Sequence, residues 1–342
     1  MKSRSDLTVL AADVGGTKVN LALFASRHGE LHRLRLHSYL SQDFESLVVP
    51  VRQFLGDDAP RLDAAAFGVA GPVQRGRAQI TNLPWVIDAE EQRGLLGIGT
   101  VGLINDLQAT AYGVLTLTAT DLLPLNAGDA QVGHIAVIAA GTGLGEGMLF
   151  WDGSHYQAVP SEGGHVDFAP RNALEAELLS FLWQRHDHAS YERLVSGPGL
   201  VTIYDFLRAT GRGEEPTWLA ARMGAEDAAA VISEVAPHGE VPLCTEALDL
   251  FTSIYGAEAG NLALKVLSTA GVYVAGGMAP KIRDKLVDGT FMAAFRAKGR
   301  MAFLLDLMPV RVVLNQMTAL QGAAYYAVRL AQEGGLDERA SR

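Results

Sequence analysis

An acid, two glycines and a threonine stand together near the start of the chain, between two apolar segments. Apolar runs on either side of a short glycine-containing turn predict a β-hairpin. Glycine lets several backbone N–H groups point at one anion, threonine adds a hydroxyl donor, and a carboxylate can hold a hydrated magnesium ion. The segment is therefore either a plain tight turn or a site for phosphate, and its residues are Asp13, Val14, Gly15, Gly16 and Thr17.

A second copy of this plan lies in residues 135–150, where an apolar run ending in Ala-Ala leads into Gly141, Thr142 and Gly143 and then into another apolar run. Residues 9–13 align with residues 137–141 without gaps. Such self-similarity indicates a duplicated domain, with one phosphate-contacting hairpin in each half. The glycine spacing also resembles a dinucleotide fingerprint, but that motif must open a helix, whereas this segment continues as a strand.

A third polar cluster contains Glu162, His165 and Asp167, with two glycines between the first two. Imidazole and carboxylates are metal ligands, so a metal site is one interpretation. A clamp for the hydroxyls of a polyol is a second, and a turn with incidental polar residues is a third. Glu192, further along, is either a surface residue or another polyol ligand.

Asp106 follows the predicted strand 101–104 and opens a predicted helix. An acid at a helix start is a common N-cap. A carboxylate at the end of a strand, near two phosphate turns, is also well placed to act as a general base. Asn82 precedes Pro84 and Trp85, in a loop that is either anchored by the tryptophan or turned toward a ligand; the residues alone favour the anchor.

The elements that must position these residues alternate between strands and helices. Apolar spacing predicts helices over residues 44–54 and 244–269 and a closing helix from Thr318. Residues 116–132 are expected to be a connector. The strand predicted at residues 271–275 ends in Gly276 and Gly277, which let a flat or charged ligand approach the backbone, and is expected to run into a helix.

Composition limits the class of protein. The 342 residues suit two domains, and the net charge of −10 without a cluster of Lys or Arg argues against nucleic-acid binding. The single cysteine, Cys244, excludes an internal disulfide framework. No apolar stretch reaches membrane-spanning length and no signal peptide is recognised, so we expect no membrane association and a cytoplasmic location.

Together and in this order, the motifs resemble those of the bacterial glucokinases, in the superfamily of sugar kinases, actin and heat-shock chaperone ATPases. The resemblance covers residues 11–324, and its motifs are the segments 12–17, 81–85, 104–106, 141–145, 162–167 and 196–199. It implies an α/β protein with the two-domain actin-like (ribonuclease H-like) ATPase fold, in which mixed sheets flanked by helices border an interdomain cleft. The implied small domain is 1–116 plus 316–342, and the large domain is 117–315.

The resemblance further implies ATP-dependent phosphorylation of glucose at its 6-hydroxyl, with Asp106 as general base and Asp13 acting on magnesium through water. Glucose would be held by Asn82, Asn105, Asp106, Glu162, His165 and Glu192. ATP would be held by Ala12, Asp13, Val14, Gly15, Gly16, Thr17, Gly141, Thr142, Gly143, Gly276 and Gly277.

The family also implies a homodimer, and two alternatives share these motifs: a kinase for another hexose, and a sugar-binding regulator that has lost catalysis. Three features depart from the pattern of relatives. Ala12 stands where a glycine often precedes the acid, and Lys18 stands where some relatives have asparagine. The cysteine-rich zinc motif of the related repressor/kinase group is missing from the sequence.

Overall fold

The first apolar run of the chain forms β1 (Leu7–Val14), the central strand of a five-stranded sheet with the order β3-β2-β1-β4-β8. Side chains of successive residues point to opposite faces of a strand. Leu10 and Ala12 lie in the apolar cluster on one face of the sheet, whereas Val9 and Ala11 lie in the cluster on the other. The run is continuously apolar because the strand is buried on both faces.

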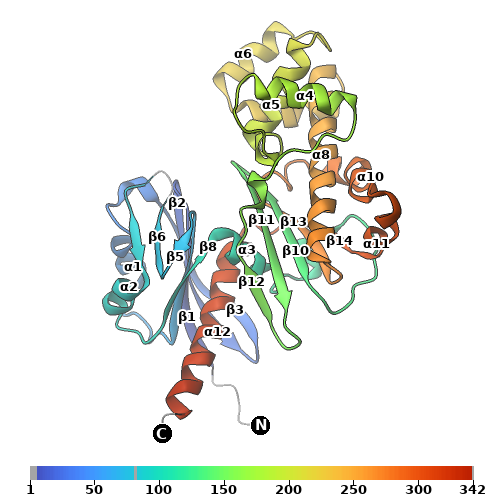
Figure 1. Cartoon of the computed structure of the whole chain (residues 1–342). Coiled ribbons are helices and arrows are strands. Elements are labelled where there is room, and N and C mark those ends of the chain that lie inside the picture. The colour runs from blue at the N-terminus through green and yellow to red at the C-terminus, as the bar shows by residue number, and fades with distance from the viewer. Residues whose placement is uncertain (1–5, 81–82, 341–342) are drawn as a thin grey trace. The chain divides into compact units, whose positions relative to one another are not determined.

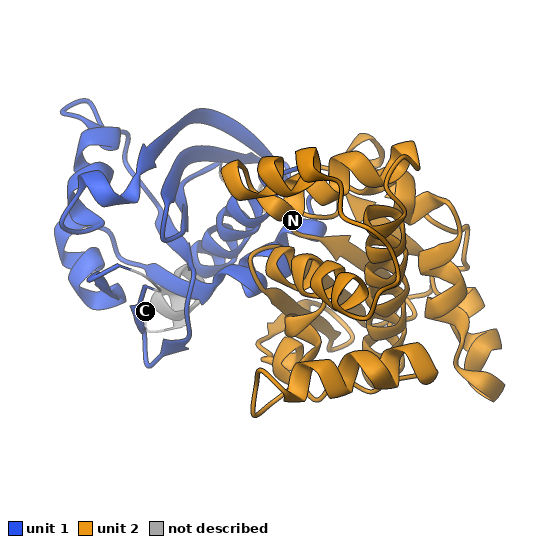
Figure 2. Cartoon of the chain, turned by 90° about the horizontal axis from the view of Figure 1, so that it is seen from above, with its two compact units in different colours: residues 1–118, 315–342 blue, residues 119–314 orange. Residues whose placement is uncertain are grey.

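The structure, a computed structural model, describes residues 6–80 and 83–340, with residues 334–340 described by their backbone alone. The chain divides into two units (Figures 1 and 2). Unit 1 consists of residues 1–118 and 315–342, and unit 2 consists of residues 119–314.

Unit 1 contains the five-stranded sheet, a small three-stranded sheet of order β5-β6-β7, and four α-helices among its described residues. In the large sheet, β1 is antiparallel to β2 and parallel to β4, which is parallel to β8. The remaining elements are β2 (Lys18–Arg27), β3 (Glu30–Leu40), η1 (Ser41–Asp43), α1 (Val48–Leu55), β4 (Ala64–Val69), β5 (Val73–Gln74), β6 (Arg77–Gln79), β7 (Val86–Asp88), α2 (Ala89–Leu96), β8 (Val101–Asn105), α3 (Asp106–Val114) and α12 (Thr318–Ala340).

Unit 2 repeats the sheet of unit 1. Its order is β12-β11-β10-β13-β14-β9, so three antiparallel strands (β12, β11, β10) are again followed by two parallel ones (β13, β14). The duplication predicted from the two hairpins is therefore confirmed. The strands are β9 (Leu122–Pro124), β10 (Ile135–Ala140), β11 (Leu144–Trp151), β12 (Tyr156–Val159), β13 (Gly271–Ala275) and β14 (Val310–Val313).

The longest helix of unit 2, α8 (Pro242–Val266), is buried along most of its length, and several other helices of the unit pack against it. This explains why α8 is rich in alanine, leucine and aromatic residues on every face. The other helices are η2 (Ala119–Asp121), η3 (Gly163–His165), α4 (Ala173–Trp183), η4 (Tyr191–Arg193), α5 (Gly197–Ala209), α6 (Thr217–Ala225), α7 (Ala228–Val235), η5 (Ala236–His238), α9 (Arg283–Val287), α10 (Thr290–Arg296), η6 (Gly299–Met301) and α11 (Ala302–Leu307).

The closing helix α12 packs directly on α3 through glycines. A Cβ added at Gly322 would lie 1.7 Å from the carbonyl oxygen of Ala109, and one added at Gly113 would lie 2.0 Å from that of Thr318. The two helix backbones therefore touch, with no room for a side chain between them. This contact fixes α3, whose first residue is Asp106.

Substituting Gly322→Val is expected to destabilise unit 1. The valine side chain cannot enter this contact without separating α3 from α12. We expect the free energy of unfolding to fall by about 3 kcal/mol, the upper end of the usual cost of overpacking. Denaturant unfolding followed by circular dichroism measures the loss. The matched control is Gly94→Val in α2, since a Cβ at Gly94 meets nothing within 4 Å; equal stability of the two variants would contradict the packing argument.

Three sequence predictions of secondary structure are wrong in detail. The helix expected from Phe44 begins at Val48, because Pro50 has no N–H to donate to residue 46 and the Phe44 carbonyl accepts from the Trp85 indole at 3.1 Å. The expected connector 116–132 contains η2 and β9, which pairs with β14. Turns occupy residues 276–282, so β13 does not run directly into a helix, and α9 begins at Arg283.

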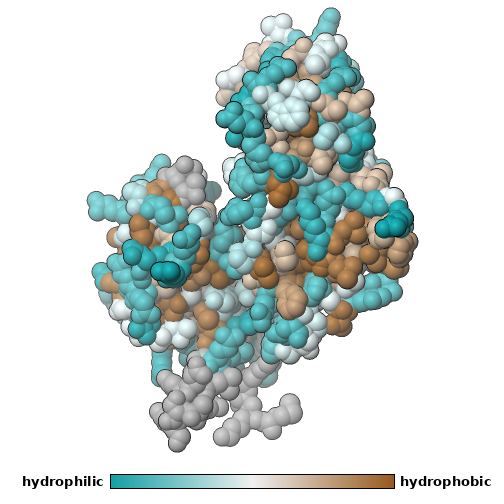
Figure 3. All heavy atoms as spheres, viewed as in Figure 1, coloured by the Kyte–Doolittle hydropathy of each residue, from teal (hydrophilic) through white to brown (hydrophobic). Residues whose placement is uncertain are grey.

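Figure 3 shows hydrophilic and hydrophobic residues interspersed over the visible face of the chain. Among the helices that the structure describes, none has the length and apolar composition needed to cross a lipid bilayer.

Candidate active site

Asp13 lies at the end of β1, where the first hairpin turns. It stands opposite Asn20 on β2, whose amide donates to Asp13 Oδ2 at 3.2 Å. The side-chain oxygen of Asn20, Oδ1, in turn accepts a hydrogen bond from the Ser38 hydroxyl on β3 at 2.7 Å. These two partners orient the carboxylate, and the strand pattern alone did not point to either of them.

The turn after Asp13 is closed by its own backbone. The Gly15 N–H donates to the Lys18 carbonyl at 2.9 Å, and the Ser41 hydroxyl donates to the Gly15 carbonyl at 2.8 Å. Thr17 is exposed and Gly16 is half-buried, so both reach solvent. The side chains of Ala12 and Val14 are fully buried in the apolar core of unit 1, which leaves only their backbones to face a ligand.

Asn105, and not Asp106, caps α3. The Asn105 side chain accepts from the Leu107 N–H at 2.8 Å, while the Gln108 side chain accepts from the Asn105 N–H at 3.2 Å, which completes a capping box. Asp106 Oδ1 also lies 2.9 Å from the Leu107 N–H. Asn105 therefore fulfils the capping role, and its side chain also forms a hydrogen bond with the Asp106 carboxylate.

Two carboxyl groups of unit 1 stand close enough to influence each other. Burial is the largest cause that raises the pKa of Asp106 to about 6, and the charge of Asp13 adds to the rise, against the hydrogen bond from Leu107. Burial also raises the pKa of Asp13, while the hydrogen bond from Asn20 lowers it. Mutual repulsion between two such carboxylates favours a cation beside them.

This donor set fits a magnesium ion held through water. Magnesium prefers oxygen ligands and commonly keeps several of its waters. Among the described residues, no three His, Cys, Asp or Glu side chains are grouped to hold a metal directly.

The second hairpin, between β10 and β11, is tied to the start of α5. The Gly141 N–H donates to the Gly143 carbonyl, and the Gly197 N–H donates to the Gly141 carbonyl, both at 2.8 Å. Ser196 caps α5 by accepting from the Gly199 N–H at 3.0 Å. The positive end of a helix dipole therefore lies beside the turn of the hairpin.

A cavity of about 490 Å³ opens in unit 2 next to this turn. Its walls bring together Gly141 and Thr142 of the hairpin with Gly277 after β13, three residues expected at the ATP site. Gly276, the residue before Gly277, packs against the backbone of β10. Its φ is +85°, and a Cβ there would lie 2.3 Å from the Ala140 carbonyl oxygen, so this position favours glycine. The cavity is large enough for a nucleoside.

Sequence reasoning missed most of the walls of this cavity. Among these wall residues, only the glycine-proline-glycine segment at the start of α5 belongs to a motif of the family resemblance. The wall residues contributed by α7 belong to no recognisable motif. The residues not foreseen at the site are Gly197, Pro198, Val201, Asp227, Ala228, Ala229, Ala230, Ser233, Met278 and Lys281.

The three residues expected to bind the sugar from unit 2 lie together. His165 Nε2 is 4.0 Å from Glu162 Oε2, and His165 Nδ1 is 3.8 Å from Glu192 Oε1. Glu192 Oε2 accepts from the Leu144 N–H at 3.0 Å, and a Cβ at Gly143 would lie 2.5 Å from that oxygen. Glu192 therefore links the polar cluster to the second hairpin, and a side chain at residue 143 would displace its carboxylate.

Asp167 does not join this cluster. Its carboxylate pairs with His188 at 2.8 Å and is exposed to solvent. The metal site considered for Glu162, His165 and Asp167 is therefore not formed by these residues. Asn82, the remaining sugar-binding candidate, lies outside the described residues, while Trp85 is buried and anchors its loop as expected.

The fold and the site define a class of protein. Duplicated mixed sheets, each with a glycine-containing hairpin beside a carboxylate, are the features expected of an actin-like ATPase fold, so the predicted fold class is confirmed. The model of the family Glucokinase matches residues 10–330. The chain belongs to the glucokinase family.

Individual relatives agree with this assignment. A glucokinase of Nostoc sp. is 46% identical over 339 residues, which cover 94% of this chain and 99% of the relative. The crystal structure of a glucokinase from an Antarctic psychrotroph superposes with a TM-score of 0.84 at 30% identity, covering 94% of this chain and 99% of that one. A glucokinase of the ROK family from Streptomyces griseus, in complex with glucose and AMPPNP, shares the fold with a TM-score of 0.61 at 22% identity, covering 94% and 99%.

Proposed function

We propose that this chain transfers the γ-phosphoryl group of ATP to the 6-hydroxyl of glucose. The observation that carries the proposal is the Asp106 carboxyl, which is freed from capping by Asn105 and whose pKa is raised to about 6. Membership of the glucokinase family supports glucose and ATP as substrates.

Asp106 acts as the general base. A sugar hydroxyl is scarcely ionised at neutral pH, so a carboxylate must take its proton as the bond to phosphorus forms. With a pKa of about 6, Asp106 is ionised at pH 7 yet is a stronger base than an exposed aspartate. Asn20 and Ser38 hold Asp13 in place nearby. When bound, magnesium supplies positive charge that stabilises the transferring phosphoryl group.

The sugar is selected by polar side chains that have few other partners. Glu162, His165 and Glu192 can each bond a different hydroxyl, and Asn105 and Asn82 complete the proposed set. Such a site can reject analogues that lack one hydroxyl by factors on the order of 10⁴ once the bound sugar shields its polar groups from water, because one of those groups is then left unpaired. The second hairpin turn faces the phosphates of ATP, and the adenosine lies in the cavity beside Gly277.

We assign separate tasks to the two units in this proposal. Unit 1 supplies Asp13, Asp106 and the first phosphate turn, and unit 2 supplies the second turn, the nucleoside cavity and the sugar cluster. On the resemblance to the family, we also propose that the protein acts as a homodimer in the cytoplasm, at the first step of glucose breakdown. Light scattering tests the dimer.

The reaction is tested by release of ADP from Mg-ATP with glucose, mannose, fructose and N-acetylglucosamine as separate acceptors. We expect turnover that depends on glucose and at least about tenfold lower kcat/KM for the other sugars, since each changes a hydroxyl at the cluster. Preference for another sugar would identify a kinase for a different hexose. Binding of glucose without release of ADP would identify a regulator and contradict the proposal.

A further inference from the structure

Two buried glutamates face each other behind the sugar cluster. Glu146 on β11 is 2% exposed and Glu258 on α8 is fully buried. Neither belongs to the motifs that identify the family, and neither has a role in the proposed reaction. Removing two carboxylates from water is costly unless each is paired or one is protonated, so their presence needs an explanation.

The pair has too few donors to remain doubly ionised. Within the described part of the chain, Glu146 Oε1 has no hydrogen-bond partner. Glu258 Oε2 accepts from the Asn261 amide at 2.7 Å, and the Lys265 ammonium lies 3.5 Å from Glu258 Oε1 without forming a hydrogen bond. One ammonium can balance one negative charge, which leaves the second carboxyl to keep its proton. Burial, followed by the charge of Glu258, raises the pKa of Glu146 to about 8.

Glu146 lies directly against the segment that carries Glu162 and His165. A Cβ at Gly163 would be 2.2 Å from Glu146 Oε2, so the backbone of η3 rests on this carboxyl. The next residue packs on the same strand, because a Cβ at Gly164 would be 2.0 Å from the Leu144 carbonyl of β11. Any added charge or movement at Glu146 is therefore transmitted to η3.

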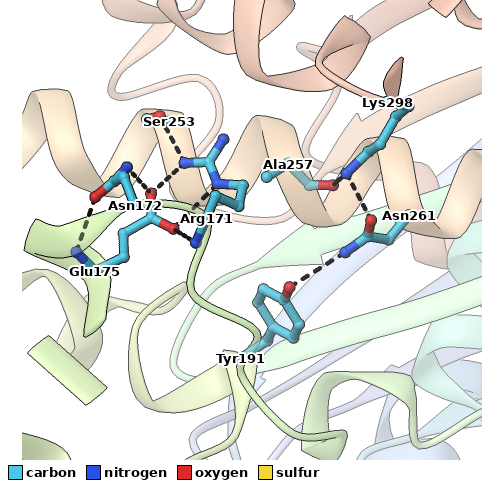
Figure 4. A network of polar contacts seen from close by, with 8 residues as sticks. All are labelled: Arg171, Asn172, Glu175, Tyr191, Ser253, Ala257, Asn261 and Lys298. Atoms are coloured by element: carbon cyan, nitrogen blue, oxygen red, sulfur yellow. Dashed lines mark hydrogen bonds and ion pairs between the residues drawn. The ribbon is translucent and has the colours of Figure 1, made fainter. Parts of the chain in front are cut away.

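Glu258 is connected to the segment that carries Glu192. Its partner Asn261 also donates to the Tyr191 hydroxyl at 3.1 Å, and Tyr191 is the first residue of η4. The Lys298 ammonium holds Asn261 in place from the other side, donating to its carbonyl at 2.5 Å and to the Ala257 carbonyl at 2.8 Å (Figure 4). Figure 4 also shows the neighbouring ion pair of Arg171 and Glu175.

We infer that Glu146 keeps its proton next to Glu258 and that the two are positioning residues, which hold the segments carrying Glu162, His165 and Glu192 at the spacing glucose requires. The inference rests on the proposed function, because it gives the pair a role in sugar binding. Loss of the proton from Glu146 places a second negative charge beside Glu258 and beneath Gly163. Because η3 packs directly on Glu146, the sugar cluster is distorted while the nucleoside cavity is left intact.

The other ionisable groups that face the pair are few. Tyr255 on α8 and Tyr191 in η4 stay neutral, because burial raises the pKa of each well above its usual range. Lys265 on α8 lies beside Glu258. Lys298, which reaches the pair through Asn261, has a pKa lowered to about 8 by burial and by the charge of Arg171. An experiment must therefore separate Glu146 from Lys298.

The test is the pH dependence of the KM for glucose in the wild type and in Glu146→Gln. Glutamine has the shape of the protonated acid and cannot ionise. In the wild type we expect the KM for glucose to rise about tenfold between pH 7 and pH 9, since a group with a pKa of about 8 passes from about nine-tenths to about one-tenth protonated. In Glu146→Gln the KM at pH 7 should stay within about twofold and the rise should disappear.

Three controls make the result decisive. The KM for ATP should be the same in both proteins at each pH. Glu240→Gln, an exposed glutamate of unit 2, should retain the wild-type profile. Glu258→Gln should shift the rise in KM to lower pH, because Glu146 then has no like charge beside it but stays buried, and this variant serves if Glu146→Gln does not fold. A rise that persists unchanged in both variants would assign the effect to Lys298 and overturn the inference.

Thermal unfolding separates this inference from the proposed function. Between pH 4.5 and about 8 the folded wild type holds a proton that an unfolded glutamate has released, so its stability falls as pH rises through this window. Glu146→Gln should lose that part of the fall even if no sugar is phosphorylated. Identical pH dependence of the melting temperature in the two proteins would contradict a proton held by Glu146, whatever the enzyme's activity.

Discussion

Asp106→Asn is expected to lower kcat for glucose by a factor of about 10² to 10⁴, the range over which a positioned general base contributes. The amide has the shape of the carboxylate but cannot take the proton of the 6-hydroxyl. Because Asn105 caps α3, the substitution leaves the helix start intact. Steady-state kinetics measures kcat, and calorimetry should show that glucose binding changes by less than about threefold, since binding and proton transfer are separate contributions.

The pH profile and stability of this variant provide its controls. In the wild type, kcat/KM should fall about tenfold per pH unit below pH 6, because Asp106 has a pKa of about 6 and must be ionised to act. At pH 7 Asp106→Asn should melt no lower than the wild type, since burial disfavours the ionised carboxylate that it removes. Asp57→Asn, an exposed residue of unit 1, should change neither quantity. Full activity in Asp106→Asn would exclude this residue as the base.

Glu192→Ala is expected to lower kcat/KM for glucose by a factor of about 10 to 150, which corresponds to the loss of a hydrogen bond to a charged group. The Glu192 carboxylate makes two contacts: one oxygen lies near His165, and the other accepts a hydrogen bond from the Leu144 N–H at 3.0 Å. Its removal deprives the sugar of one partner and leaves the nearly buried Leu144 N–H unpaired. The effect should appear chiefly in the KM for glucose.

Gly143→Ala tests the same geometry without removing any functional group. The new Cβ would lie 2.5 Å from Glu192 Oε2, so the carboxylate must move and the KM for glucose should rise here too. Glu240→Ala, at an exposed position of unit 2, is the matched control and should behave as the wild type. An unchanged KM in both Glu192→Ala and Gly143→Ala would remove Glu192 from the sugar site.

The parts of the fold that could be predicted from sequence are those encoded locally. The two hairpins are visible because each needs an apolar run on both sides of its glycines, and the strand before Asp106 is visible for a similar reason. The polar cluster around His165 is compact in sequence, so its members were bound to be neighbours. Glu192 could be linked to it only by the family resemblance, since its contact with the Leu144 N–H joins residues far apart in the chain.

What could not be predicted depends on packing between distant segments. The sequence does not decide whether Asp106 or Asn105 caps α3, because asparagine and aspartate are both good N-cap residues. Only the folded structure shows that Asn105 is the cap. The wall that α7 contributes to the nucleoside cavity consists of small apolar residues, which look like any core. Glu146 and Glu258 lie far apart in the sequence and become a pair only when β11 packs near α8.

The contact between α12 and α3 also bears on the order in which the protein is made. Unit 2 is one continuous segment, whereas the core of unit 1 is completed by Leu320, Ala323, Ala324 and Ala327 from the last helix. Domains generally fold as units during synthesis, beginning with the residues that emerge first. The sugar cluster and nucleoside cavity can therefore form on the ribosome, while α3 stays unsupported until residues 318–327 have emerged. Asp106 is fixed last, so a nascent chain can fold its ligand-binding residues in unit 2 before it is able to phosphorylate anything.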